Sequence, residues 1–209
     1  MKQKLNKIVL WTVILMVLTA TQSVSAGGGG GCGTEFKVIN KNGLIAGVSP
    51  TAMGEFHAFL WQHGSKTDLG TLGGTCSLAT DINERGQVVG VSATASGELH
   101  AFLWKKGKMI DLGTLGGASS SALAINDHGL IVGQSETALG ELHAFLWKKG
   151  EMFDLGTLGG GTTSIATDIN ERGRVVGVAW TASAEPHTFL WKKGQMIDLT
   201  TLTAAPGDD

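Results

Sequence analysis

Apolar and polar side chains alternate in short runs along most of this chain, and the alternation has the period of a β-strand. In His100–Trp104 it places His100 and Phe102 on one face and Ala101 and Leu103 on the other. Beyond the first residues of the chain, no apolar stripe has the helical period. Because both faces of such strands carry apolar groups, the pattern predicts β-sheets that are covered on both sides.

One block of residues occurs four times, which indicates that a single structural unit is copied along the chain. The block is His-Ala-Phe-Leu-Trp followed by Asp-Leu-Gly-Thr-Leu-Gly-Gly, and its copies begin at His57, His100, His143 and His187. The steps between the copies are 43, 43 and 44 residues. A second block, Ile-Asn-x-x-Gly, keeps these steps and begins at Ile39, Ile82, Ile125 and Ile169.

Each unit is predicted to contain four short antiparallel strands. In the second unit they fall at Ser77–Asn83, Gln87–Ser92, His100–Trp104 and Met109–Leu112. Asn83 and Gly86 bound one predicted hairpin turn and Lys105–Gly107 forms another, because Asn and Gly suit tight turns. Four antiparallel strands in about 43 residues is the size of one β-propeller blade.

The units span about 34–74, 75–117, 118–160 and 161–204, and together they predict one all-β domain over residues 34–202. The predicted fold class is four tandem four-stranded antiparallel repeats that form a small, four-bladed β-propeller. An open β-repeat array and a β-solenoid are the alternatives.

The end units differ from the middle ones, as capping units do. Phe36 stands where the later units have alanine, and residues 198–204 lack the glycines that lead onward in the earlier copies. Residues 205–209 are expected to be a frayed tail. The alternative to capping is a fragment of a longer array, completed by a second copy of itself.

Residues 1–26 have the pattern of an export signal. Three lysines precede the apolar run Ile8–Ala20, and Val24, Ser25 and Ala26 supply the small residues of a cleavage site. The run is shorter than the roughly 20 residues of a spanning helix, so no membrane span is expected after signal removal. Residues 27–33 are a glycine-rich tether. We expect an exported protein that is extracellular, on the cell surface or periplasmic.

The two cysteines, Cys32 and Cys76, lie at matching points of adjacent units. An oxidising compartment permits a disulfide between them, and two unpaired thiols are the alternative. A lipid anchor at Cys32 is less favoured, because glycines occupy the positions before it. Removing the three leader lysines leaves 13 basic against 18 acidic residues. The sequence therefore has no basic footprint for nucleic acid.

The combined blocks resemble the HAF repeat family, named for the His-Ala-Phe that stands here at residues 57–59, 100–102 and 143–145. The resemblance extends over residues 34–202, and the fourth unit departs from it at Thr188 and in its missing glycines. It implies an extracellular or cell-surface bacterial repeat protein with a propeller fold, and no particular biochemical role.

One histidine and one aspartate recur in every unit, namely His57, His100, His143 and His187, and Asp68, Asp111, Asp154 and Asp198. A ring would arrange each set symmetrically, so that a metal ion or ligand could lie on its axis. One residue per unit lacks the close spacing of metal motifs, however. We favour a structural role, in which His and Asp of adjacent strands satisfy each other or the backbone. We therefore assign no metal site, no cofactor and no catalytic residue.

The tryptophans Trp61, Trp104, Trp147 and Trp191 also recur once per unit. We expect them to be packing residues rather than a platform for sugar stacking. Trp180 breaks the repeat, standing where Ser92 and Ser135 occur at the neighbouring loop starts, which makes it a candidate binding residue. The glycine-rich block lacks the lysine and the helix of a phosphate loop, and the paired lysines of the hairpin tips are expected to be solvated.

No candidate set is unique to one place, as an asymmetric active site requires. The favoured hypothesis is an exported, non-catalytic repeat scaffold that presents loops to a protein or polysaccharide partner, with self-association as a further expectation. A glycan-active hydrolase or lyase that uses residues around the central opening is the first alternative. A ring stabilised by a metal ion is the second.

Overall fold

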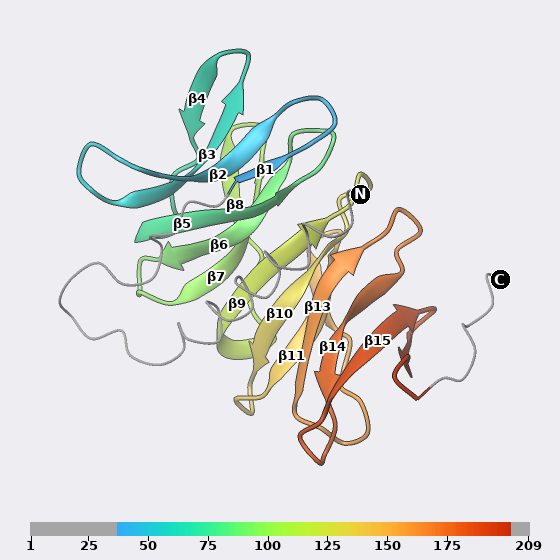
Figure 1. Ribbon diagram of the computed structural model, residues 1–209. Coiled ribbons are helices and arrows are strands. Elements are labelled where there is room, and N and C mark those ends of the chain that lie inside the picture. The colour runs from blue at the N-terminus through green and yellow to red at the C-terminus, as the bar shows by residue number, and fades with distance from the viewer. Residues whose placement is uncertain (1–36, 202–209) are drawn as a thin grey trace. The chain divides into compact units, whose positions relative to one another are not determined.

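The computed structural model describes residues 37–201, and this part of the chain consists of β-strands and their connections. Figure 1 shows the strands coloured in chain order. The described strands are β1 (Lys37–Ile39), β2 (Ile45–Pro50), β3 (Phe56–Gln62), β4 (Ser65–Asp68), β5 (Gly73–Ile82), β6 (Val88–Thr94), β7 (Leu99–Lys105), β8 (Lys108–Asp111), β9 (Gly116–Ile125), β10 (Ile131–Thr137), β11 (Leu142–Lys148), β12 (Glu151–Asp154), β13 (Thr163–Ile169), β14 (Val175–Trp180), β15 (Pro186–Lys192) and β16 (Gln195–Asp198).

Each successive group of four strands along the chain forms one antiparallel meander. In the second unit β6 lies between β5 and β7, and β8 pairs with the outer side of β7. The first turn of this unit is closed by Asn83, whose N–H donates to Gln87 O and whose carbonyl accepts from Gly86 N–H. We call the meanders β1–β4, β5–β8, β9–β12 and β13–β16 blades 1 to 4.

The first strand of blades 2 to 4 carries a β-bulge, and the glycine opposite it is required by sterics. In blade 2 the register shifts after Ala79. A Cβ on Gly90 would overlap the carbonyl oxygen of Leu78. The bulge therefore explains why glycine stands at this point of the repeated second strand. The same obstacle faces the equivalent glycines, Gly133 and Gly177.

Consecutive blades pack face to face around hydrophobic clusters. The cluster between blades 2 and 3 includes Val89 and Leu103 from blade 2 and Ile131 and Phe145 from blade 3. Equivalent clusters lie between blades 1 and 2 and between blades 3 and 4. Each blade thus has one face that contacts the preceding blade and one that contacts the following blade, which explains the apolar groups on both faces of its strands.

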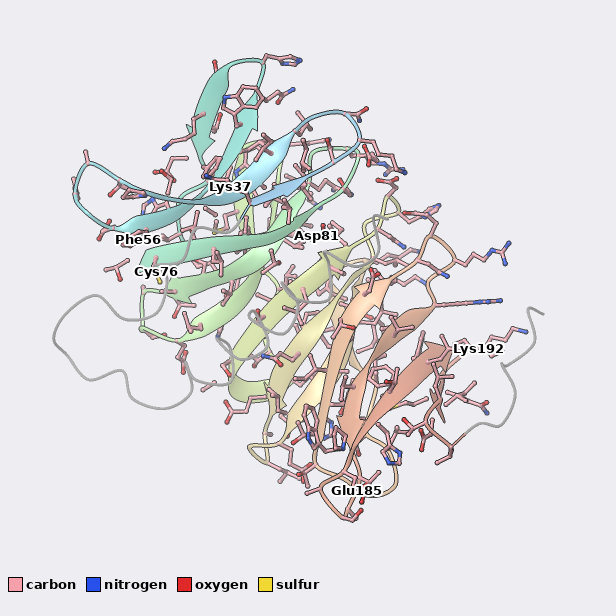
Figure 2. The ribbon with its side chains drawn as sticks, viewed as in Figure 1. Lys37, Phe56, Cys76, Asp81, Glu185 and Lys192 are labelled. Carbon is pink, nitrogen blue, oxygen red and sulfur yellow. The ribbon has the colours of Figure 1, made fainter. Side chains whose placement is uncertain are left out.

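Short parallel pairings also join neighbouring blades. Phe56 of β3 pairs with Cys76 of β5, and Leu142 of β11 pairs with Thr163 of β13. Through these pairings β1–β8 form one eight-stranded sheet and β9–β16 form another. Phe56 and Cys76 are labelled near each other in Figure 2.

The predicted all-β class and the tandem four-stranded antiparallel repeats are confirmed. The first strands are longer than predicted, since β5 and β9 begin at Gly73 and Gly116, which pair with Thr94 and Thr137. Among residues 37–201 the hydrophobic clusters join consecutive blades, and none joins blade 4 to blade 1.

The predicted export signal, the tether, Cys32 and the tail at 205–209 lie outside the described residues. Within residues 37–201 we find no helix with the length and apolar character that a membrane crossing needs.

Candidate functional site

The connections of each blade lie alternately at its two ends. The turn end carries the turns between the first and second strands and between the third and fourth strands. The loop end carries the loop between the second and third strands and the linker to the next blade. Figure 2 places Lys192, at a turn, and Glu185, in a loop, at opposite ends of blade 4.

Charge differs between these ends. The turn end carries most of the basic side chains, among them the lysine pairs at 105–106, 148–149 and 192–193 and Arg85, Arg172 and Arg174. The loop end is acidic and carries Glu55, Asp68, Glu98, Asp111, Glu136, Glu141, Asp154, Glu185 and Asp198. Sequence reasoning missed this difference, although the signal is present, because the lysine pairs recur in one connection of successive units and the loop glutamates in another.

The recurring histidines and aspartates pair with each other at the loop end, inside each blade. The histidine Nδ1 lies close to the aspartate Oδ2 in all four blades: 2.9 Å for His57 and Asp68, 2.8 Å for His100 and Asp111, 2.8 Å for His143 and Asp154, and 2.7 Å for His187 and Asp198. The hydrogen bond from His187 is the main cause that lowers the pKa of Asp198. The favoured structural role for these residues therefore has a direct geometric basis.

The same aspartates also fix the linker to the next blade. Asp111 Oδ1 accepts the N–H of Gly113 at 2.8 Å. Ser120 of blade 3 then donates to Gly113 O at 2.6 Å and accepts the N–H of Ala101 at 2.8 Å. The His–Asp pair, the linker and the next blade thus form one hydrogen-bonded network, which is repeated after blades 1 and 3.

The His–Asp pairs of different blades do not form a common centre. Each histidine contacts the aspartate of its own blade, and the described residues show no ion pair between a histidine of this set and an acid of another blade. The nearest additional acids belong to the same blade: Glu55 is 3.6 Å from His57 Nε2, and Glu141 is 3.4 Å from His143 Nε2. In the part of the chain that the structure describes, no group of three or more His, Cys, Asp or Glu is placed to hold a metal ion.

Two carboxylates on first strands were not anticipated as special. Asp81 accepts the N–H of Ile82 and, across the blade interface, the N–H of Ile125, both at 2.8 Å. Burial is the main cause that raises the pKa of Asp81 to about 6, and the charge of Asp168 adds to the shift. Burial also raises the pKa of Asp168. A sequence signal exists, because the equivalent residues of blades 1 and 3 are the apolar Val38 and Ala124.

The repeated asparagines join the blades at the turn end. Asn40 Nδ2 donates to Asn83 O at 2.9 Å, Asn83 Nδ2 donates to Asn126 O at 3.1 Å, and Asn126 Nδ2 donates to Asn170 O at 3.0 Å. The side-chain oxygen of each asparagine accepts N–H groups of its own turn. Sequence reasoning identified these residues only as turn formers, whereas Asn40, Asn83 and Asn126 each also connect their blade to the next.

Three of the recurring tryptophans pack as predicted. Trp104, Trp147 and Trp191 lie against the clusters between blades. Trp61 belongs to the first blade, which has no preceding blade among the described residues, and it is 39% exposed.

Trp180 is half-buried and pairs with Pro186 at the end of β14. The strand register corrects its assignment, because its equivalents are Ala93 and Glu136 rather than Ser92 and Ser135. The equivalent of the two serines is Ala179, which pairs with the blade-4 histidine as they do with theirs.

Cys76 is disulfide-bonded. The only other cysteine of the chain is Cys32, which lies outside the described residues. Of the two alternatives that the sequence left open, this finding supports the bridge.

The loops at the loop end share one backbone hydrogen bond, and those of blades 1 and 3 expose an apolar tip. In blade 1 the N–H of Thr51 donates to Glu55 O at 2.7 Å, and in blade 3 the N–H of Thr137 donates to Glu141 O at 2.8 Å. The tips of these two loops are Met53, which is 89% exposed, and Leu139, which is 85% exposed. These loops are the candidate binding surface, because rigid backbone holds large apolar groups in solvent there.

The stacked four-stranded blades define a β-propeller fold, and comparison with solved structures supports this class. The chain is similar to TolB from Acinetobacter baumannii, with a TM-score of 0.54 and 14% identity over 74% of this chain and 39% of that one. It is similar to the β-propeller domain of the Trilobed protease from Pyrococcus furiosus, described as having an open velcro topology, with a TM-score of 0.53 and 13% identity over 83% of this chain and 56% of that one.

An acylaminoacyl peptidase from Pyrococcus horikoshii is also similar, with a TM-score of 0.51 and 15% identity over 78% of this chain and 27% of that one. The chain therefore spans less than two thirds of each of these three structures. At such identities the likeness concerns the fold alone. No protein-family model matches the sequence, and no curated protein matches it either.

Proposed function

We propose that this chain is an exported, non-catalytic repeat scaffold that presents its loop end to a protein or polysaccharide partner. The observation that carries the proposal is the pair of exposed apolar tips, Met53 and Leu139, on loops of the same shape. Backbone hydrogen bonds within each loop fix the tips, so little conformational entropy is lost when a partner binds.

The roles of the recurring polar residues support a scaffold. His100 and Asp111 contact each other, and Ser120 bonds the backbone of Ala101 in β7 and of Gly113 in the linker. Side chains committed to such bonds hold the blades together, which supports a structural role for them. Equivalent tips on blades 1 and 3 also suit a partner with repeating units, which gains avidity by contacting both at once.

The acidic character of the loop end narrows the class of partner. Glu98, Glu141 and Glu185 belong to the same connections as the tips or to their equivalents. Like charges oppose each other across an interface, so this surface favours a neutral polysaccharide or a basic protein surface over an anionic polymer.

A glycan array and a panel of basic peptides, probed with the full chain, test the proposal. We expect binding to a neutral glycan or a basic peptide that is lost in the double variant Met53→Ser and Leu139→Ser. Phe153→Thr is the matched control, since Phe153 is also an exposed apolar residue, 45% exposed, but lies on β12. Binding that survives the double variant, or that the control abolishes equally, would overturn the proposal, and so would turnover of a bound glycan.

A further inference from the structure

The contacts between consecutive blades follow one pattern at the turn end. Each asparagine side chain donates to the backbone of the next asparagine, as described above. The N–H of the following residue donates to an acidic side chain of the next blade: Lys41 N–H to Glu84, Glu84 N–H to Asp127, and Asp127 N–H to Glu171. In this pattern the following blade supplies the carbonyl that accepts from the asparagine side chain and an acid that accepts from the next N–H.

Among residues 37–201 no blade follows blade 4, which presents the donor half of this pattern. Asn170 is exposed, whereas Asn126 is only 3% exposed. Asp168 accepts only the N–H of Ile169 among the described residues, whereas its equivalent Asp81 also accepts an N–H from the next blade. Val176 is 37% exposed, although the equivalent valine of blade 2 is fully buried.

Blade 1 presents the complementary half. Ile39 is 69% exposed, whereas its equivalents Ile82, Ile125 and Ile169 are 6 to 7% exposed because each packs against the preceding blade. Ile39 follows the apolar Val38, just as Ile125 of blade 3 follows an alanine. In blade 3 the N–H of Ile125 donates to Asp81 of the preceding blade.

The backbone of β1 offers the groups that blade 4 lacks. The N–H of Asn40 donates to Leu44 O of the neighbouring strand. Because adjacent N–H groups of a strand point to opposite sides, the N–H of Ile39 is directed away from β2. This N–H can therefore face an acceptor such as Asp168. The carbonyl of Asn40 is equivalent to the carbonyls of Asn83 and Asn126, each of which accepts from the asparagine side chain of the preceding blade.

The position that is acidic in blades 2, 3 and 4 is Lys41 in blade 1. The carboxylate of Glu171 already accepts the N–H of Asp127 in blade 3. Blade 1 therefore lacks the acid that would accept the N–H of Glu171, and the contact with another copy would consist of the asparagine bond, the aspartate bond and the apolar packing.

One backbone N–H of β15 that would face a following blade is hydrogen-bonded within blade 4. In blades 1 to 3 the N–H of the alanine after the histidine donates to a serine of the next blade. In blade 4 the N–H of Thr188 donates instead to Thr200 Oγ of the same blade, at 3.0 Å. A further blade therefore need not supply that serine, and a blade that is not covalently linked can fit.

From these contacts we propose that a second copy of this chain docks head to tail, with its blade 1 on blade 4 of the first copy. Asn170 donates to Asn40 O of the second copy, Asp168 accepts from its Ile39 N–H, and Val176 packs against the Ile39 side chain. The contact continues the interface already present three times within the chain. A head-to-tail contact closes into a ring or extends into a filament, according to the rotation between copies.

Analytical ultracentrifugation of the full chain from micromolar to submillimolar concentration tests the proposal. We expect the mass to rise with concentration. Ile39→Asp disables the head and Val176→Asp disables the tail, and each substitution should weaken association by more than about tenfold. Both side chains are exposed, so both variants should unfold at the temperature of the unaltered chain when dilute; a variant that does not is replaced by the milder Ile39→Ser or Val176→Ser.

Mixing the two variants gives the directional outcome. Neither variant alone has an intact head and an intact tail, but the mixture retains one intact head and one intact tail. We therefore expect a one-to-one heterodimer that forms only on mixing. A monomeric unaltered chain at every concentration, self-association of either variant alone to the full extent, or the absence of a heterodimer would each overturn head-to-tail docking. A chain that stays monomeric would indicate that a different protein covers the end faces. Full self-association of a single variant would indicate contact between like faces.

Discussion

The interface between blades 2 and 3 and the outer face of blade 4 carry valine and leucine at equivalent positions, yet only the first is buried. Val89 is fully buried and its equivalent Val176 is 37% exposed. Leu103 is buried, and its equivalent Leu190 is only half-buried. The difference arises from the presence or absence of a following blade. Burial in this chain is therefore a property of neighbouring repeats rather than of the repeat itself.

The largest expected effect comes from placing a charge on each of the two faces. An aspartate at Val89 would lie in the cluster between blades 2 and 3 with no partner, so Val89→Asp should lower the free energy of unfolding by about 4 kcal/mol or prevent folding. Val176→Asp should lower it by less than about 1 kcal/mol, because water already reaches that position. Denaturant unfolding of dilute protein measures both. Equal losses would show that the outer face of blade 4 is covered in the monomer.

A second pair of variants compares the equivalent faces of blades 1 and 2, of which only that of blade 2 packs on a preceding blade among the described residues. Trp104 packs on the cluster between these blades, whereas Trp61 faces away from them and is 39% exposed. We expect Trp104→Ala to reduce the free energy of unfolding by about 3 kcal/mol and Trp61→Ala by about 1 kcal/mol, since only the first leaves a cavity. Unfolding followed by circular dichroism at dilute concentration measures both losses. A larger loss for Trp61→Ala would contradict the assignment of the free face.

The features that the sequence predicted correctly depend on contacts within one unit. The strand after Gln87 and the turn after Asn83 follow from alternation and turn chemistry over a few residues. The pairing of His100 with Asp111 was favoured because the two recur together on adjacent predicted strands. Repetition strengthened each of these inferences, since the same signal is present in every copy.

The missed features depend on how one blade lies against the next. The donation from Asn83 to Asn126 spans 43 residues, and the donation from Ile125 to Asp81 spans 44. No local pattern reveals which side chain of one unit meets which backbone group of another. The exposure of Val176 could not be predicted for the same reason, because its Val-Val-Gly sequence is identical to that of blade 2.

A third pair of variants isolates the hydrogen bond between blades. Asn→Asp keeps the oxygen that accepts the turn N–H groups but replaces the side-chain donor with an acceptor. In Asn126→Asp that acceptor faces the carbonyl of Asn170, so we expect a loss of about 2 kcal/mol. In Asn170→Asp the side chain is exposed, and the loss should stay below about 0.5 kcal/mol. Urea unfolding at neutral pH distinguishes the two, and a comparable loss for both would mean that the turn bonds, not the bond between blades, carry the effect.

The smallest expected effect is a pH dependence that originates at the interface between blades 2 and 3. Asp81 has a folded pKa of about 6 against an ordinary value of 3.8. Between these values the folded chain holds a proton that the unfolded chain has released. The contribution of Asp81 to stability therefore falls as the pH rises from about 4 to about 6, and it is constant above that range.

Removing this group should remove the dependence. We compare the free energy of unfolding of the unaltered chain with that of Asp81→Ala at each pH. The difference should favour the unaltered chain by about 1 to 2 kcal/mol more at pH 4 than at pH 7, a figure reduced for the partial access of water to Asp81. Asp168→Ala is the control on the outer face, where the pKa is raised in the same direction but the side chain is exposed, so its pH dependence should be smaller. Urea unfolding at both pH values provides the four free energies needed. If the two substitutions change the pH dependence equally, burial between blades is not what distinguishes Asp81 from Asp168, and the charge repulsion between these carboxylates becomes the better explanation.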